Sequence, residues 1–212
     1  MKNIVNLIKL QYNSLFALKR SLLILVLMGI FFATVQPFMI VFAGAMFLMV
    51  SCYSLVFYEE RSKMNYLIYS LPVTTNEYIL SKYIFGFINT LISILISVIL
   101  ASIVKILGYS SEVSSMPIYA ISLSTLAIGL FFLSVVQPAA LVLGSEKGRY
   151  VLVLLSVLPL TFSTSLVQYL PEINLTLNPT IIGILLTLVA ITILLTSYFI
   201  TCNIFSKKEI SY

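Results

Sequence analysis

Long runs of hydrophobic residues make up most of the chain, and short polar segments separate them. A helix needs about 20 residues to cross the hydrocarbon core of a bilayer. Gln36-Pro37 interrupts the first of these runs, and proline disfavours helix at the residue before it, so we expect a tight turn there. The pattern therefore predicts six membrane spans, at about 21–35, 38–58, 83–107, 117–143, 151–169 and 179–205.

Residues 1–19, ahead of the first run, have a different pattern. One face of a helix would be mostly apolar, and it comprises Ile4, Val5, Ile8, Tyr12, Leu15 and Phe16. The opposite face would carry Asn3, Asn6, Lys9 and Asn13. This two-sided pattern predicts a helix lying in the membrane interface, and the alternative is a frayed, partly apolar terminus. A signal peptide is not expected, because charge stands at both ends of the segment and no small-residue cleavage site follows.

The composition supports a membrane protein. Hydrophobic residues make up 60% of the chain and charged residues 9%, with a mean hydropathy of +1.11. Soluble domains are about half apolar and about a quarter charged. The expected fold class is therefore all-α integral membrane, with residues 1–212 forming a single transmembrane domain.

The positions of the basic residues predict the orientation. Of the twelve Lys and Arg residues, only Lys105 lies outside the termini and the second and fourth connections between predicted spans. Basic residues gather on the cytoplasmic side of membrane proteins. We therefore expect a multi-pass protein of the cell membrane, with both termini and residues 59–82 in the cytoplasm. This placement accounts for the net charge of +5 without a nucleic-acid partner.

The residue types that catalysis needs are missing from the predicted spans. The chain has no histidine, no acidic residue lies well within a span, and Cys52 and Cys202 are isolated. No phosphate-binding loop of the form G-x-x-x-x-G-K-[ST] occurs. We therefore expect no catalytic residue, no metal site and no bound cofactor in this chain. Ion-coupled carriers place charged groups at membrane depth, and a passive channel needs a repeated polar helix face. Neither feature occurs in the predicted spans, so both classes of protein are disfavoured.

A few polar or helix-breaking residues do lie within the predicted spans: Gln36, Asn89, Gln137 and Pro138. Proline inside a helix frees a backbone carbonyl and bends the helix. Two interpretations are open for Gln137-Pro138: a structural kink stabilised by a neighbouring helix, or a hinge or polar point lining the substrate path. Gln36 and Asn89 are further candidates for the path or hinge.

The segment 59–82, EERSKMNYLIYSLPVTTNEYILSK, is the largest charged island inside the chain. Tyr58 to Tyr69 extends the second span, Ser70-Leu71-Pro72 breaks that helix, and Thr74 to Glu77 offers caps for the next one. A helix, a break and a capped helix between two spans would give another protein a surface to act on.

This segment resembles the membrane subunits of ATP-binding-cassette transporters of the type-2 export class. The resemblance rests on E-E-x-x-K followed by L-x-x-S-L-P-V-T-x-x-E-Y-I-x-x-K-Y, which begins at Glu59 and ends at Tyr83. In that family this connection carries the coupling helix, which docks on the ATPase. The resemblance implies docking through Glu59, Glu60, Arg61, Lys63, Asn65, Tyr66, Leu67, Ser70, Leu71, Pro72, Val73, Thr74 and Glu77. Arg61-Ser62-Lys63 departs from the family pattern, which has a small residue or glycine after the acidic pair.

The resemblance implies a permease subunit that pairs with a second permease, the same or related, and with two cytoplasmic ATPase subunits. ATP and Mg would be bound by the ATPase alone. Compact bacterial permeases of this kind resemble those that export amphipathic peptides, bacteriocins, toxins or lipophilic compounds, or confer immunity to them. The many Phe, Tyr and Met residues suit a path for apolar cargo or simply face lipid. The alternative function is a membrane scaffold or immunity protein that binds a partner without transport.

Overall fold

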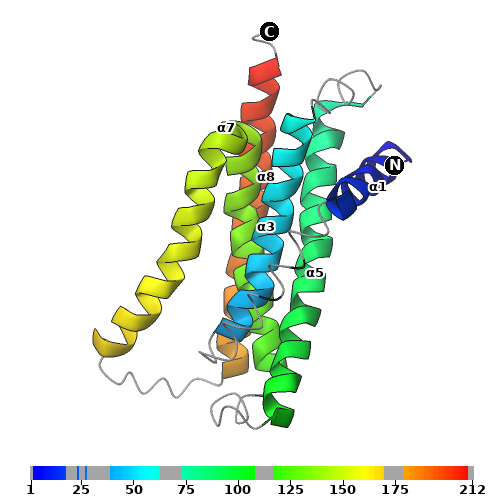
Figure 1. Cartoon of the computed structure of the whole chain (residues 1–212). Helices are drawn as coiled ribbons and strands as arrows, with labels where there is room; N and C mark the ends of the chain where they lie inside the picture. Colours follow the sequence, from blue (N-terminus) through cyan, green and yellow to red (C-terminus); the bar gives the residue numbers. More distant parts are fainter. Residues whose placement is uncertain are drawn as a thin grey trace.

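Five helices make up the part of the chain that the computed structural model describes, which is residues 2–17, 23, 27, 39–62, 73–107, 117–169 and 179–209. They are α1 (Lys2–Ala17), α3 (Met39–Arg61), α5 (Thr75–Leu107), α7 (Ile118–Tyr169) and α8 (Pro179–Glu209) (Figure 1). No strand occurs in these residues. The all-α prediction is confirmed for this part of the chain.

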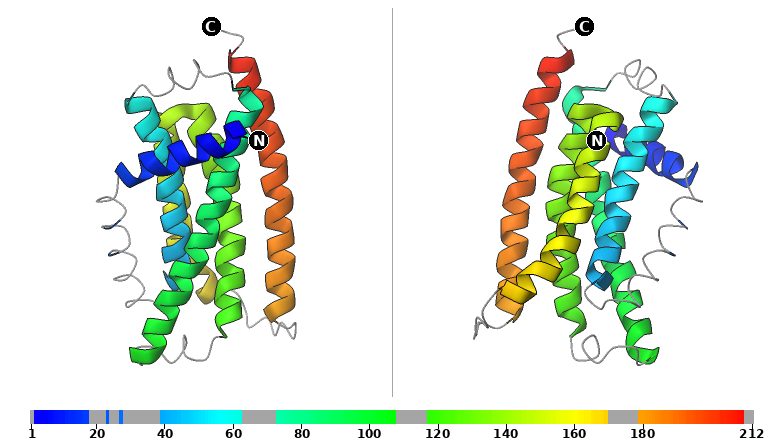
Figure 2. Two further views of the ribbon diagram at one scale, coloured as in Figure 1. Left: turned by 90° about the vertical axis from the view of Figure 1, so that its right-hand side faces the viewer. Right: turned by 60° about the vertical axis from the view of Figure 1, so that its left-hand side comes forward.

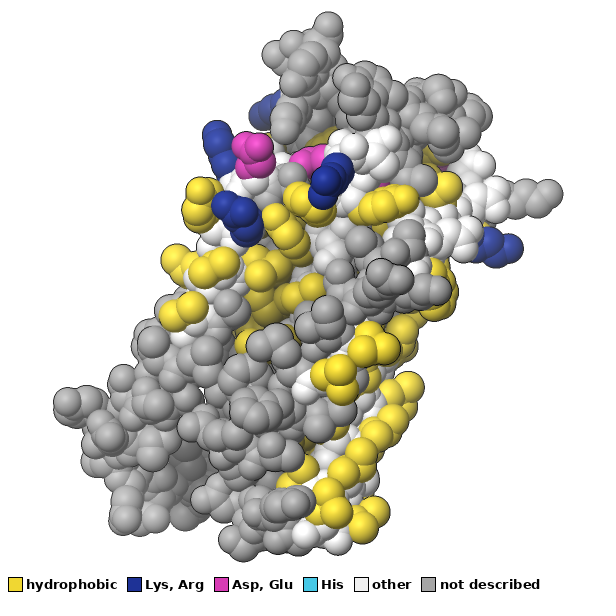
Figure 3. Space-filling view, in the orientation of Figure 1, with side chains coloured by type: hydrophobic (Ala, Val, Ile, Leu, Met, Phe, Trp, Pro, Cys, Tyr) yellow, Lys and Arg dark blue, Asp and Glu magenta, His cyan; other side chains and the backbone are white. Residues whose placement is uncertain are grey.

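Helices α3, α5, α8 and the first half of α7 run side by side along one axis, and α1 lies across them (Figures 1 and 2). The second half of α7, beyond its bend, leans away from this group. The end of α3, the start of α5, the bend of α7 and the end of α8 all lie at the same end of the bundle. We call this the charged end, because the charged side chains visible in Figure 3 gather there above an apolar flank. The start of α1 lies near it as well, so both ends of the described chain share one side.

Among the described residues, three helices are long and apolar enough to cross a membrane: Thr75–Leu107, Ile118–Gly144 and Gly183–Phe205. Helix α3 has 23 residues, which corresponds to a length of about 34 Å at 1.5 Å per residue. The predicted first span, 21–35, lies outside the described residues apart from Leu23 and Leu27. The count of six spans therefore stays a prediction.

Helix α1 packs against α5 and α3 with a face that differs from the apolar face expected from the sequence. The side chains it buries are Leu7, Gln11, Ser14 and Leu15. Val5 and Phe16 belong to the expected apolar face, yet they are exposed. The polar Gln11 turns inward, where its side-chain amide Nε2 donates a hydrogen bond of 3.0 Å to Ser81 Oγ of α5. An interfacial position for α1 stays a prediction.

The core lies between α3, α5 and the first half of α7. One cluster contains Leu48, Cys52 and Leu55 of α3, Phe85 of α5 and Leu133 of α7. A second cluster lies near the charged end, and it contains Val56, Ile79, Tyr83, Ala140, Leu141 and Phe205. The apolar contacts of α8 therefore reach the same end of the bundle as those of α3 and α5.

Glycines let these helices approach closely. A β-carbon built on Gly44 of α3 would lie 2.5 Å from the backbone oxygen of Ser93 in α5. Beside this contact, Ser97 Oγ donates a 3.0 Å hydrogen bond to the Ile40 carbonyl. Gly86 of α5 likewise faces the side chain of Leu133 in α7, with no room for a β-carbon. Small residues at helix crossings are typical of membrane bundles, where close backbone contact replaces the hydrophobic driving force.

Helix α7 bends sharply at Gly144, the one residue within it whose backbone angles are not helical (φ 78°, ψ 177°). Residues with a side chain rarely adopt such an angle, so glycine is required at this point. The sequence predicts a compact charged turn over 144–150, but the chain turns at Gly144 itself and residues 145–150 are already helical. Pro138 does not interrupt the helix.

We expect Gly44→Ala to destabilise the bundle by about 1–3 kcal/mol, because the added methyl group meets backbone that cannot rotate away. The readout is the temperature at which the buried Cys52 thiol reacts with a fluorogenic maleimide, in detergent and in a Cys202→Ser background. Gly183→Ala is the matched control, since a β-carbon there meets only the Leu123 side chain at 3.4 Å or more. Equal reaction temperatures for the two variants would contradict the close crossing.

Candidate functional site

A buried ion pair joins the two ends of the charged segment. Lys82 Nζ in α5 donates a 2.5 Å hydrogen bond to Glu59 Oε1 in the last turn of α3. The side chains of Lys82 and Glu59 are 0% and 2% exposed. Tyr78 Oη donates a second hydrogen bond, of 3.2 Å, to Glu59 Oε2. Glu59 and Lys82 are the first and last residues of the segment 59–82, so the pair closes it.

Burial makes this pair a strong constraint. Removing charged groups from water costs several kcal/mol for each ion, and only close pairing with good hydrogen bonds compensates that cost. Both carboxylate oxygens of Glu59 have a partner, and Lys82 Nζ also lies 5.4 Å from the centre of the Tyr78 ring. The pair therefore holds the end of α3 against the start of α5.

The start of α5 carries a complete N-terminal cap. Thr74 N donates to Glu77 Oε2 at 3.2 Å, and Glu77 N donates to Thr74 Oγ1 at 3.4 Å. This reciprocal arrangement is a capping box, which satisfies donors that the first turn of a helix leaves unpaired. The sequence predicts caps at Thr74 to Glu77, and this cap is confirmed. The helix it starts continues without interruption to Leu107.

A polar network connects α5, α7 and α8 about one turn further along. Pro138 has no N–H, so the carbonyl of Ser134, four residues earlier in α7, loses its donor within the helix. Ser197 Oγ of α8 donates a 2.6 Å hydrogen bond to this carbonyl. Tyr83 Oη of α5 lies 2.9 Å from both Ser197 Oγ and Thr201 Oγ1. A neighbouring helix thus supplies the bond that the proline removes.

The other polar residues predicted within the spans are buried in helix contacts. Gln137 Nε2 donates a 2.8 Å hydrogen bond to the Lys82 carbonyl, and Asn89 Nδ2 donates to the Phe85 carbonyl at 3.0 Å. The side-chain oxygens of both residues have no hydrogen-bond partner among the described residues. These contacts favour the structural interpretation of Gln137 and Pro138 over a lining role. Gln36 lies outside the described residues.

Helix α1 adds contacts on the other side of α5. Besides the Gln11–Ser81 hydrogen bond, the Tyr12 ring packs edge-on against Phe85, with 5.0 Å between ring centres. Burial raises the pKa of Tyr12 above its usual value. Residues 81–85 of α5 are therefore held from three sides, by α1, by α3 and by α7 or α8.

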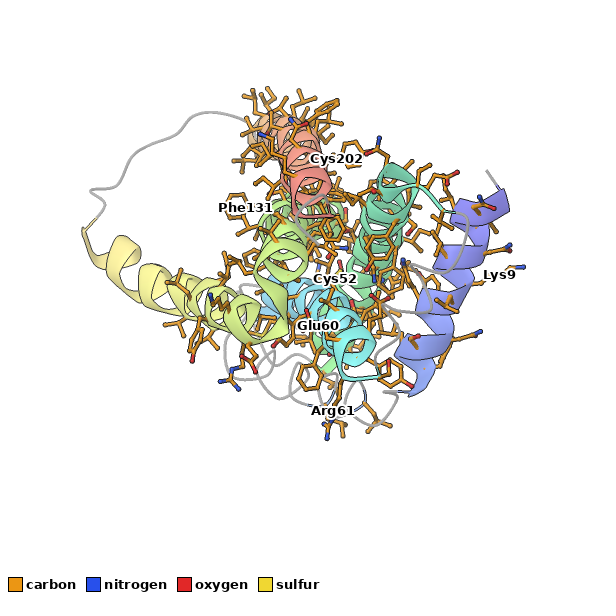
Figure 4. The ribbon with its side chains drawn as sticks, turned by 90° about the horizontal axis from the view of Figure 1, so that it is seen from above. Lys9, Cys52, Glu60, Arg61, Phe131 and Cys202 are labelled. Atoms are coloured by element: carbon orange, nitrogen blue, oxygen red, sulfur yellow. The ribbon has the colours of Figure 1, made fainter. Side chains whose placement is uncertain are left out.

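The exposed part of the charged end combines two connections that are distant in sequence. Glu60 and Arg61 are exposed at the end of α3, and the Glu60 carboxylate faces Gly144 at the bend of α7 (Figure 4). Arg61 points outward in the same view. Glu146, Lys147 and Arg149 are exposed just beyond the bend. Nothing in the sequence indicates this neighbour, because only the fold brings Gly144 beside the acidic pair.

The structure describes six of the residues predicted to dock: Glu59, Glu60, Arg61, Val73, Thr74 and Glu77. Of these, Glu59 is buried, and the other five are exposed or partly exposed. The remaining predicted docking residues lie outside the described residues: Lys63, Asn65, Tyr66, Leu67, Ser70, Leu71 and Pro72. Within the described ranges, no group of three or more His, Cys, Asp and Glu residues could hold a metal ion.

A family model described as "ABC-2 family transporter protein" matches residues 6–206. Searches of curated proteins and of solved structures gave no significant match.

We expect Lys82→Met to destabilise the protein by about 3–5 kcal/mol, because Glu59 would be left as a buried charge without its cation. Adding Glu59→Leu to this variant removes the orphaned charge and restores most of the stability. The Cys52 reaction temperature measures both effects. Lys147→Met removes an exposed lysine at the same end and serves as the control, with a change within about 0.5 kcal/mol. If Lys82→Met alone were as stable as Lys147→Met, the Glu59–Lys82 pair would not constrain the fold.

Proposed function

We propose that this chain, which belongs to the ABC-2 family of transporter proteins, forms the membrane path of an ATP-driven exporter and is moved through residues 59–82. As a member of this family, the chain is the non-catalytic permease component of an ABC transporter. ATP is hydrolysed by a partner ATPase subunit. We propose in addition a docking site for that ATPase, an orientation of the chain in the membrane and a class of cargo.

The observation that carries the docking proposal is the buried Glu59–Lys82 pair. The pair fixes both ends of the segment 59–82 to long helices, α3 on one side and α5 on the other. A force applied to the segment is therefore transferred to both helices at their common end. Glu60, Arg61 and Thr74 present exposed side chains at this end, beside the part of the segment that would dock.

The assembly we propose contains two permease subunits and two ATPase subunits. ATP and Mg bind to the ATPase subunits, and closure of that pair on ATP tilts the helices through the docking segment. The second permease is either another copy of this chain or a related chain. A compact permease with these proportions of Phe, Tyr and Met fits an apolar or amphipathic cargo, and we propose peptides, toxins or lipophilic compounds.

The charged end faces the cytoplasm in this proposal, with both termini on that side. Support comes from the Lys and Arg residues, which concentrate in the termini and in the connections at this end. A fluorescent or phosphatase fusion after Tyr212 tests the orientation: we expect fluorescence and no phosphatase activity, since phosphatase fusions are active only outside the cytoplasm. The matched fusion after Gly108, which follows the other end of α5, gives the opposite result. Phosphatase activity at the C-terminus would reverse the proposed orientation.

Changes within the docking segment test the ATPase contact. We expect Leu71→Asp, or Pro72→Ala combined with Tyr66→Asp, to abolish co-purification of the ATPase and ATP-driven transport while leaving membrane insertion intact. The physical reason is that a charge placed in a protein–protein contact stays desolvated and unpaired there. Leu107→Asp is the control, because Leu107 is exposed at the opposite end of α5.

The same preparation separates transport from scaffolding. Purified permease and ATPase in vesicles are assayed for ATP hydrolysis with a panel of amphipathic peptides as probes. Stimulation by a peptide supports the exporter. ATPase binding without any stimulation supports a scaffold or immunity protein, and unimpaired ATPase binding by both docking variants would refute the docking site.

A further inference from the structure

The acidic pair at the end of α3 contacts two different helices. Consecutive residues on a helix point in different directions, about 100° apart, so Glu59 and Glu60 cannot share one partner. Glu59 turns into the bundle and meets Lys82 and Tyr78 of α5. Glu60 turns toward the bend of α7 at Gly144.

The Glu60 contact has a physical basis. A β-carbon built on Gly144 would lie 3.2 Å from Glu60 Oε1, so the carboxylate lies directly against the glycine backbone. The second half of α7 begins at this bend. The first turn of a helix has unpaired N–H groups and the positive end of the helix dipole, and both attract a carboxylate.

The bend of α7 contains no free loop. Gly144 is the single non-helical residue between the two halves of α7, and Gly148 packs against the backbone of Ala139 and Ala140. A group bound at the bend therefore acts on both halves of α7 rather than on a free loop. Through Glu60, the end of α3 is connected to that bend, as Glu59 connects it to α5.

We propose that Glu59 and Glu60 act as a joint that makes the end of α3, the start of α5 and the bend of α7 move as one body. This deepens the proposed function, on which it rests: movement of the docking segment would reach the fourth connection through the joint, without a direct contact between that connection and the ATPase. Glu59, Lys82 and Glu60 are thus positioning residues for transport.

Spin labels at Asn76 and Tyr150 measure whether the start of α5 and the bend of α7 move together. Both residues are exposed, one at the start of α5 and the other beyond the bend of α7. The full chain is studied with its ATPase in lipid nanodiscs, in a Cys202→Ser background where the remaining Cys52 is fully buried. In the otherwise unmodified protein we expect the label-to-label distance to change by less than about 2 Å between the nucleotide-free and ATP–vanadate states, because a rigid body keeps its internal distances.

The decisive variant combines Glu59→Leu, Lys82→Met and Glu60→Gln, which keeps the apolar packing but removes the charged contacts. We expect a broader distance distribution without nucleotide, and a shift of more than about 2 Å with ATP and vanadate. Permease-dependent ATP hydrolysis changes at least about fivefold, the lower range of a coupling between sites. Glu146→Gln, an exposed acid just beyond the bend, leaves all three values unchanged.

The outcomes separate the joint from the proposed function. A large shift in the unmodified protein, or a triple variant that behaves like it, would overturn the joint while ATPase docking still stands. Failure of the ATPase to bind would overturn the proposed function, and the width of the nucleotide-free distribution would still test the joint. A normal Cys52 reaction temperature for the triple variant confirms that any loss is not due to misfolding.

Discussion

The arrangement at the charged end depends on one buried pair of opposite charges. Neither Glu59 nor Lys82 can leave the other without stranding a charge away from water, so the ends of α3 and α5 have one favourable register. The capping box at Thr74 and Glu77 then fixes where α5 begins, and the contacts of residues 81–85 with α1, α7 and α8 gather the remaining helices around that start. The strongest polar constraint in the described structure thus lies at the end where an ATPase would act, rather than in the middle of the bundle.

Polar groups deeper in the described bundle are used for helix contacts. Ser97 bonds the backbone of α3, Ser197 bonds the carbonyl freed by Pro138, and Gln137 bonds the backbone of α5. Each of these side chains joins one helix to the backbone of another, and such bonds add specificity where apolar packing alone would let helices slide. This division of roles fits the proposed mechanism, in which the interior sets helix register and the charged end would receive the force from a partner.

Much of the fold could be predicted from the sequence, because apolar runs of membrane length, the caps at Thr74 to Glu77 and the end of the span at residue 143 depend on local composition. The ion pair between Glu59 and Lys82 could not be predicted in this way. Glu59 and Lys82 are 23 residues apart, and the sequence is equally consistent with an exposed position for both. One feature of the sequence could have indicated their burial, since Glu59 and Lys82 each border a long apolar run. The buried face of α1 was missed for a similar reason: Gln11 turns inward only because Ser81 is there to accept its hydrogen bond. Likewise, nothing local to Glu60 indicates that the bend at Gly144 lies beside it.

The proline of α7 has a consequence for how this sequence can vary. The Ser134 carbonyl needs an outside donor only because residue 138 has no N–H, and Ser197 is that donor. If residue 138 were alanine, its N–H would bond the Ser134 carbonyl within α7. The hydroxyl at position 197 would then contribute less to the stability of the protein. Positions 138 and 197 are therefore epistatic: losing the serine is costly beside the proline and mild without it. Their substitutions are expected to be correlated among related chains, although 59 residues separate them.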